Sequence, residues 1–84
     1  HNMDKFIIFG HRACGFCRQA KAVLQANAVE FNYIDIHEEG ISQADLSKKI
    51  GQPAKTVPQI FYNDLYVGGY QELIKYLKKE KLLK

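Results

Sequence analysis

The sequence lacks the long apolar runs, repeats and biased segments that mark membrane, solenoid or disordered proteins. Its 84 residues hold no apolar run near the roughly 20 residues that span a bilayer, and no linker or internal repeat is visible. We therefore expect one globular domain over residues 1–84, with a core of modest size. His1 and Asn2 precede Met3 and are expected to be a remnant of expression.

The chain also lacks a strong charge imbalance. It has 12 Lys and Arg residues against 9 Asp and Glu, which gives a net charge of +3. No basic stripe with interleaved aromatic residues is present, so nucleic-acid binding is not expected. The acidic residues Asp35, Glu38 and Glu39 do not have the spacing of a cation-binding loop, so we expect a solvated loop and no metal site there.

Cysteine is scarce, and the two that occur, Cys14 and Cys17, are three residues apart. No second cysteine pair is available to complete a tetrahedral zinc site. A purely structural disulfide over so short a span would constrain the unfolded chain little. No secretion signal is visible, so a reducing, cytoplasmic setting is expected, where a close cysteine pair more often serves catalysis or metal binding. Zinc binding and a structural disulfide remain the alternatives to a redox pair.

The cysteines lie between a short apolar run and an amphipathic segment. Residues 6–9 are aromatic or β-branched, which favours a buried strand. Apolar residues then recur with helical spacing at Phe16, Ala20, Val23 and Leu24. This pattern predicts a helix whose first turn carries both cysteines on one face, where a disulfide between them is geometrically plausible.

The surroundings of Cys14 favour its thiolate form. A helix N-terminus offers free backbone N–H groups and the positive end of the helix dipole. The nearby basic residues are His11, Arg12, Arg18 and Lys21. Such surroundings lower a cysteine pKa from about 8.5 toward roughly 3.5–7.5. We predict a redox pair in which Cys14 attacks and Cys17, one turn deeper, resolves.

The rest of the chain alternates strand and helix signals. Residues 29–36 are expected to form a strand parallel to the first, and Ser42 with Asp45 marks the start of a short helix that ends at Gly51. A hairpin over residues 59–67 turns at Asn63-Asp64, and a last helix follows Gly68-Gly69. The order predicts an α/β protein, a four-stranded mixed sheet with helices on its faces.

Three motifs together resemble the glutaredoxin family of the thioredoxin superfamily. They are Cys14-Gly15-Phe16-Cys17, Thr56-Val57-Pro58 and Gly68-Gly69, and the resemblance runs from about Lys5 to Leu77. It implies a thioredoxin fold with the order β-α-β-α-β-β-α and three helices. It also implies a glutathione-dependent oxidoreductase that reduces protein disulfides and glutathione mixed disulfides. The implied partners are glutathione and disulfide-bearing or glutathionylated proteins. The charge pattern and the lack of long apolar runs predict neither a nucleic-acid nor a membrane partner, and we expect a monomer.

The resemblance also implies a binding site for glutathione. The Val57–Pro58 bond would be cis and packed against the cysteine pair, and the Val57 backbone would pair with the tripeptide like an added strand. The helix end opened by Gly69 would approach a carboxylate. Carried over by position, the contacts are His11, Phe16, Thr56, Val57, Pro58, Gly69, Tyr70 and Gln71.

The chain departs from the family pattern at three points. His11 stands where many members carry lysine, and histidine is only partly charged at neutral pH. Arg12 or Lys55 is therefore a candidate for the missing positive charge. Gln71 stands where many members carry an acid, and Gly15-Phe16 stands where the dithiol branch usually has Pro-Tyr.

The last departure leaves two alternative functions open. Gly-Phe resembles the single-thiol, iron–sulfur branch, in which two chains would each give Cys14 to a [2Fe–2S] cluster and two glutathiones would complete the four thiolates. Such a protein would act as a cluster scaffold or carrier. The other alternative is an electron donor to ribonucleotide reductase that is itself reduced by thioredoxin reductase.

Overall fold

The protein is built around a four-stranded sheet, which a computed structural model describes within residues 5–84. The strands are β1 (Phe6–Gly10), β2 (Phe31–Asp35), β3 (Gln59–Tyr62) and β4 (Leu65–Gly68), and their order in the sheet is β2-β1-β3-β4. Strand β1 runs parallel to β2 and antiparallel to β3, and β4 runs antiparallel to β3. The predicted mixed sheet is confirmed. The expected expression remnant at residues 1–2 lies outside the described residues.

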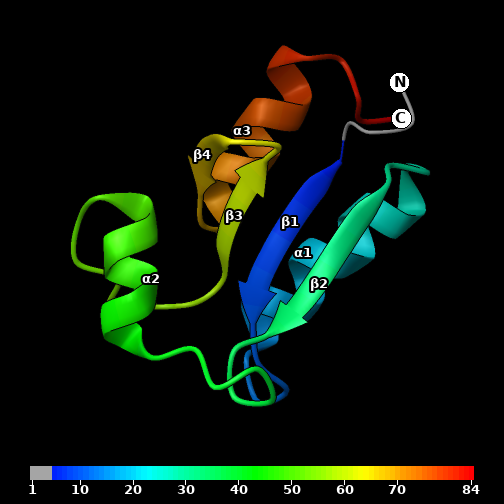
Figure 1. Ribbon diagram of the computed structural model, residues 1–84. Helices are drawn as coiled ribbons and strands as arrows, with labels where there is room; N and C mark the ends of the chain where they lie inside the picture. The colour runs from blue at the N-terminus through cyan, green and yellow to red at the C-terminus, as the bar shows by residue number, and fades with distance from the viewer. Residues whose placement is uncertain (1–4) are drawn as a thin grey trace.

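Three helices cover the sheet: α1 (Gly15–Ala26), α2 (Gln43–Ile50) and α3 (Tyr70–Lys79). Helices α1 and α3 pack together on one face, while α2 lies apart on the other side (Figure 1). The order of elements and the three-layered arrangement agree with the predicted thioredoxin fold. Within the part of the chain that the structure describes, no helix is both long and apolar enough to cross a bilayer.

The sheet separates two hydrophobic clusters, because successive side chains of a strand point to opposite faces. The main cluster lies under α1 and α3, and its fully buried members are Phe6, Ile8, Ala20, Leu24, Ile60, Leu73 and Leu77. The second cluster lies under α2 and contains Phe9, Ile36, Leu46, Ala54 and Phe61. The larger core therefore holds the helix that carries both cysteines.

The predicted ends of α2 are confirmed. The Ser42 hydroxyl accepts a hydrogen bond from the Asp45 N–H at 3.0 Å, and the Asp45 carboxylate accepts one from the Ser42 N–H at 2.9 Å. This reciprocal pair is a capping box. Gly51 ends the helix with φ of 78°, a left-handed conformation that glycine adopts without steric cost.

Two local predictions differ from the structure. Strand β2 begins at Phe31 rather than Val29, because Ala28 takes a left-handed φ of 57° and the Val29 N–H bonds back to the Leu24 carbonyl at 3.0 Å. Phe16 continues the apolar spacing of α1 in the sequence, yet its side chain is 55% exposed while Cys17 is fully buried. The buried face of α1 is therefore rotated from Phe16 toward Cys17 at its first turn.

Candidate active site

Cys14 is the N-cap residue of α1, as the sequence predicts. Its backbone is extended, and its sulfur accepts a hydrogen bond from the Cys17 N–H at 3.0 Å. The sulfur takes the position that a side-chain oxygen takes at most helix N-caps. At such a position the helix dipole and the free backbone N–H groups favour a negative charge on the capping atom. The sulfurs of Cys14 and Cys17 lie at disulfide-bonding distance, with 5.2 Å between their Cα atoms. Cys14 is partly exposed, so an incoming thiolate can reach its sulfur but not that of buried Cys17.

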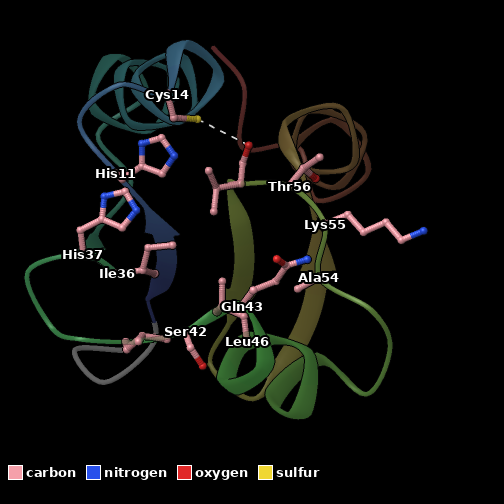
Figure 2. Close-up of a pocket in the computed structure, with 12 residues that line it drawn as sticks. His11, Cys14, Ile36, His37, Ser42, Gln43, Leu46, Ala54, Lys55 and Thr56 are labelled. Atoms are coloured by element: carbon pink, nitrogen blue, oxygen red, sulfur yellow. Dashed lines mark hydrogen bonds between the residues drawn. The ribbon is translucent and has the colours of Figure 1, made fainter.

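A cis peptide bond joins Val57 to Pro58 beside the cysteine pair, which confirms the conformation that the family resemblance implied. The Cys14 sulfur lies 3.5 Å from the Val57 carbonyl oxygen (Figure 2). Among residues 5–84 the Val57 N–H has no hydrogen-bond partner, since β3 begins only at Gln59. An extended peptide could therefore pair with this backbone next to the reactive sulfur.

A hollow of about 300 Å³ opens between this backbone and the start of α3, and we call it the α3 hollow. It is lined by Phe16, Thr56, Val57, Pro58, Gly69, Tyr70, Gln71 and Glu72. All but Glu72 were predicted as contacts from the sequence. The Phe16 and Tyr70 rings meet with their centroids 5.8 Å apart, which explains why Phe16 is exposed: it forms a wall of this hollow instead of the core.

Glu72 is the member of the α3 hollow that sequence reasoning missed. Its carboxylate accepts a hydrogen bond from the Gly69 N–H at 3.0 Å, at the N-terminus of α3. The available signal was the Gly69-x-x-Glu72 spacing, because glutamate three residues after an N-cap commonly turns back to the cap N–H. Glu72 brings to this hollow the negative charge that Gln71 lacks.

A second hollow, of about 580 Å³, lies on the other side of the Thr56–Val57 backbone and is called here the α2 hollow. Cys14, His11 and Lys55 line it together with Leu46 of α2. Thr56 and Val57 belong to both hollows. His11 therefore shares the α2 hollow with the predicted contacts Thr56 and Val57. The remaining predicted contacts line only the α3 hollow, and they are Phe16, Pro58, Gly69, Tyr70 and Gln71.

His37 also lines the α2 hollow and was not predicted. Its ring stacks on that of His11, with the centroids 4.7 Å apart and the planes 9° from parallel (Figure 2). His11 Nδ1 is buried and has no hydrogen-bond partner within residues 5–84. No spacing in the sequence indicates this pair, because β1 and β2 bring the two histidines together only through the parallel pairing of the strands.

The loop that carries His37 is held by Asp35. The Asp35 carboxylate accepts hydrogen bonds from the His37 N–H at 2.9 Å and the Glu38 N–H at 3.0 Å. Both hydrogen bonds lower the pKa of Asp35 below its ordinary value, and the bond from the Glu38 N–H has the larger effect. Asp35 thus helps to shape this loop, and the predicted loop is present at these residues.

The basic residues near Cys14 differ in how they are engaged. Arg12 forms an exposed ion pair with Glu38 at 3.0 Å and lines a separate hollow. Arg18 donates to the Arg12 carbonyl oxygen at 2.7 Å. Lys55 is exposed on the wall of the α2 hollow, and no ion pair engages it in the described part of the chain. Of the two candidates for the missing positive charge, Lys55 is the one placed at a hollow that Cys14 lines.

Comparisons with known proteins agree on one family. A family model described as Glutaredoxin matches residues 6–67. The chain is 45% identical over 78 residues to "Glutaredoxin" of Vibrio cholerae, covering 87% of this chain and 90% of that protein. It is 37% identical over 78 residues to "Glutaredoxin 1" of Escherichia coli K12, covering 87% and 92%.

Solved structures give the same result. The structure of reduced Escherichia coli glutaredoxin has a TM-score of 0.81 and 34% identity, covering 92% of this chain and 96% of that chain. The structure of a buckwheat glutaredoxin–glutathione complex has a TM-score of 0.77 and 25% identity, covering 96% of this chain and 74% of that chain.

Proposed function

This chain belongs to the glutaredoxin family and is a glutathione-dependent thiol–disulfide oxidoreductase, and we propose that Cys14 and Cys17 carry its reaction at the junction of the two hollows. The observation that supports this assignment best is the position of the Cys14 sulfur. It caps α1, lies 3.5 Å from the Val57 carbonyl oxygen, and is within reach of Cys17. A thiolate stabilised there is both a nucleophile and a good leaving group.

For a glutathione mixed disulfide, the Cys14 thiolate attacks the glutathione sulfur and the substrate protein leaves as a thiolate. A second glutathione thiolate then attacks the glutathione sulfur on Cys14, which releases oxidised glutathione and restores Cys14. For a protein disulfide, Cys14 attacks one substrate sulfur, and Cys17 then attacks Cys14, which frees the reduced substrate. The resulting Cys14–Cys17 disulfide is reduced by two glutathiones.

Glutathione offers one peptide backbone, two carboxylates and one ammonium group. We place its cysteine backbone against Val57, whose N–H has no hydrogen-bond partner within residues 5–84. Its γ-glutamyl end lies in the α3 hollow, where the first-turn N–H groups of Tyr70 and Gln71 meet the carboxylate and Glu72 meets the ammonium. Its other carboxylate points toward the α2 hollow, where Lys55 supplies positive charge and His11 forms part of the wall.

A cluster-binding function finds little support in the described residues. A [2Fe–2S] cluster would need Cys14 from two chains and two glutathiones as outside ligands. The comparisons favour the oxidoreductase over this role and over the ribonucleotide reductase donor. A reducing cytosol, rich in glutathione, is the compartment in which we expect the enzyme to act.

The cysteine roles are tested by two serine variants. With a glutathionylated peptide, glutathione and glutathione reductase, Cys14→Ser should abolish turnover because the attacking sulfur is gone. Cys17→Ser should keep deglutathionylation, because Cys14 alone completes that cycle, and should lose reduction of a protein disulfide. Equal loss of both activities in both variants would contradict the assigned roles. Repeating the wild-type assay with thioredoxin reductase in place of the glutathione system tests the alternative reductant.

A further inference from the structure

The buried sulfur of Cys17 and the hydroxyl of Tyr33 both lie next to Gly10, which has no side chain. A Cβ built on Gly10 would lie 2.6 Å from the Cys17 sulfur and 2.7 Å from the Tyr33 hydroxyl oxygen. Both atoms thus border the same small space, which is open only because residue 10 is glycine. Cys17 is fully buried, and Tyr33 projects from the neighbouring strand β2.

Tyr33 connects this buried space to solvent. Its hydroxyl donates a hydrogen bond to the His11 carbonyl oxygen at 3.2 Å. Its side chain also lines a hollow of about 500 Å³ at the β2 edge, together with Lys21, Asp35 and Arg12. Burial, and then the negative charge of Asp35, raise the pKa of Tyr33, with Arg18 acting in the opposite direction. The phenol therefore keeps its proton at neutral pH and is available as a donor.

Reduction of the Cys14–Cys17 disulfide leaves a charge at this place. An external thiolate attacks the exposed Cys14 sulfur and forms a new sulfur–sulfur bond. The Cys14–Cys17 bond breaks, and Cys17 departs with the bonding electron pair as a thiolate. An anion in a fully buried site is costly unless a hydrogen bond meets it.

We propose that the Tyr33 hydroxyl turns from the His11 carbonyl to the Cys17 sulfur and donates a hydrogen bond to the thiolate as it forms. This role rests on the proposed dithiol reaction and deepens it, since it assigns a partner to the resolving sulfur. The thiolate is afterwards protonated by water entering from the β2-edge hollow. In the opposite direction, the same hydrogen bond orients the Cys17 thiolate toward the mixed disulfide on Cys14.

The test measures reduction of the internal disulfide in a single turnover. Oxidised protein is mixed with excess dithiothreitol or, separately, glutathione, quenched with acid, alkylated and analysed by mass. Tyr33→Phe removes one oxygen and should slow disulfide opening about tenfold, the usual effect of losing one hydrogen bond to a charged group. Tyr62→Phe, a partly buried tyrosine packed in the main cluster, is the matched control and should open at the wild-type rate. Equal rates in Tyr33→Phe and wild type would overturn the proposal.

A purely structural role of Tyr33 is distinguished in the Cys17→Ser background. There only Cys14 acts, so adding Tyr33→Phe should leave deglutathionylation unchanged. If Tyr33 merely anchored the His11 loop, its loss would slow this single-thiol reaction as well, which would also overturn the proposal. Absence of deglutathionylation even with Tyr33 intact would count against the proposed function instead, while the dithiothreitol measurement would still test Tyr33.

Discussion

At the scale of single residues, Gly10 has the tightest surroundings of the glycines near the cysteines. We predict that Gly10→Ala destabilises the protein by about 1–3 kcal/mol, the usual cost of inserting a methyl group into a packed core. The reason is the approach of the new Cβ to within 2.7 Å of Cys17 Sγ and Tyr33 Oη. Urea unfolding followed by circular dichroism measures the change.

Gly15→Ala provides the matched control for this prediction. A Cβ at Gly15 meets no other atom within 4 Å, and the residue lies inside α1. Alanine there should leave the free energy of unfolding unchanged or raise it by less than about 1 kcal/mol, because alanine loses less backbone entropy in a helix. Equal destabilisation by both substitutions would show that the space between Cys17 and Tyr33 is not the cause.

The residues that the sequence predicted and those that it missed differ in a physical way. Cys14 could be placed because a helix start is a local pattern, and the Val57–Pro58 bond because a family motif carries it. His37 and Tyr33 could not be placed at the site from spacing alone, because the pairing of β1 with β2 brings them close to residues far away in the chain. Glu72 could have been found from the Gly69-x-x-Glu72 spacing, which is typical of a side chain that turns back to the start of its helix.

At the scale of elements, the capping box of α2 allows a direct test. We predict that Ser42→Ala lowers the free energy of unfolding by about 1 kcal/mol, as expected for the loss of an N-cap hydroxyl. The Asp45 N–H would then lose its 3.0 Å partner. Gln43→Ala, at an exposed position in the same turn, is the control and should change stability little. If Ser42→Ala left the free energy of unfolding unchanged, water would be replacing the hydroxyl as hydrogen-bond acceptor without loss of stability.

The stability that the capping box gives to α2 depends on pH, because Asp45 is one of its two members. The Ser42 N–H, and then the Ser42 hydroxyl, lower the pKa of Asp45 below its ordinary value near 4. The stability that this carboxylate contributes is therefore present above that ordinary value and is lost as pH falls through the lower folded-state pKa. Asp45→Ala should destabilise the protein at pH 7, and its difference from wild type should disappear in strongly acid solution.

The elements themselves follow closely from the sequence, and their errors have local causes. Strand and helix order could be predicted because apolar periodicity and caps are strong in so short a chain. The start of β2 was placed too early, since nothing in the sequence marks the left-handed Ala28 that turns the chain after α1. Phe16 has the helical spacing of the core residues of α1, yet it lines the α3 hollow. An apolar residue of a binding hollow can therefore have the same spacing as a core residue.

At the scale of the whole molecule, the sheet divides the protein into a larger and a smaller core. Helices α1 and α3 share the main cluster with the inner strands, whereas α2 contributes Leu46 to the smaller one. Stability is then not uniform, because elements with fewer buried apolar contacts open at lower free energy than the core. Helix α2 also forms one wall of the hollow that Cys14 lines. We therefore predict that the site lies between a layer that opens only with global unfolding and one that opens at lower free energy.

Hydrogen exchange would reveal this division. Leu24→Ala should cost about 2–5 kcal/mol, since it empties a fully buried site in the main cluster. Amides of α1, α3, β1 and β3, which exchange through global unfolding, should speed up by a common factor. Amides of α2 should exchange at their wild-type rates, because local opening already limits them. Leu46→Ala removes packing that is lost in both local and global opening, so it should speed exchange in α2 and in the globally exchanging elements by a similar factor. Slow α2 amides that respond to Leu24→Ala as strongly as those of α1 would mean that both layers unfold only together.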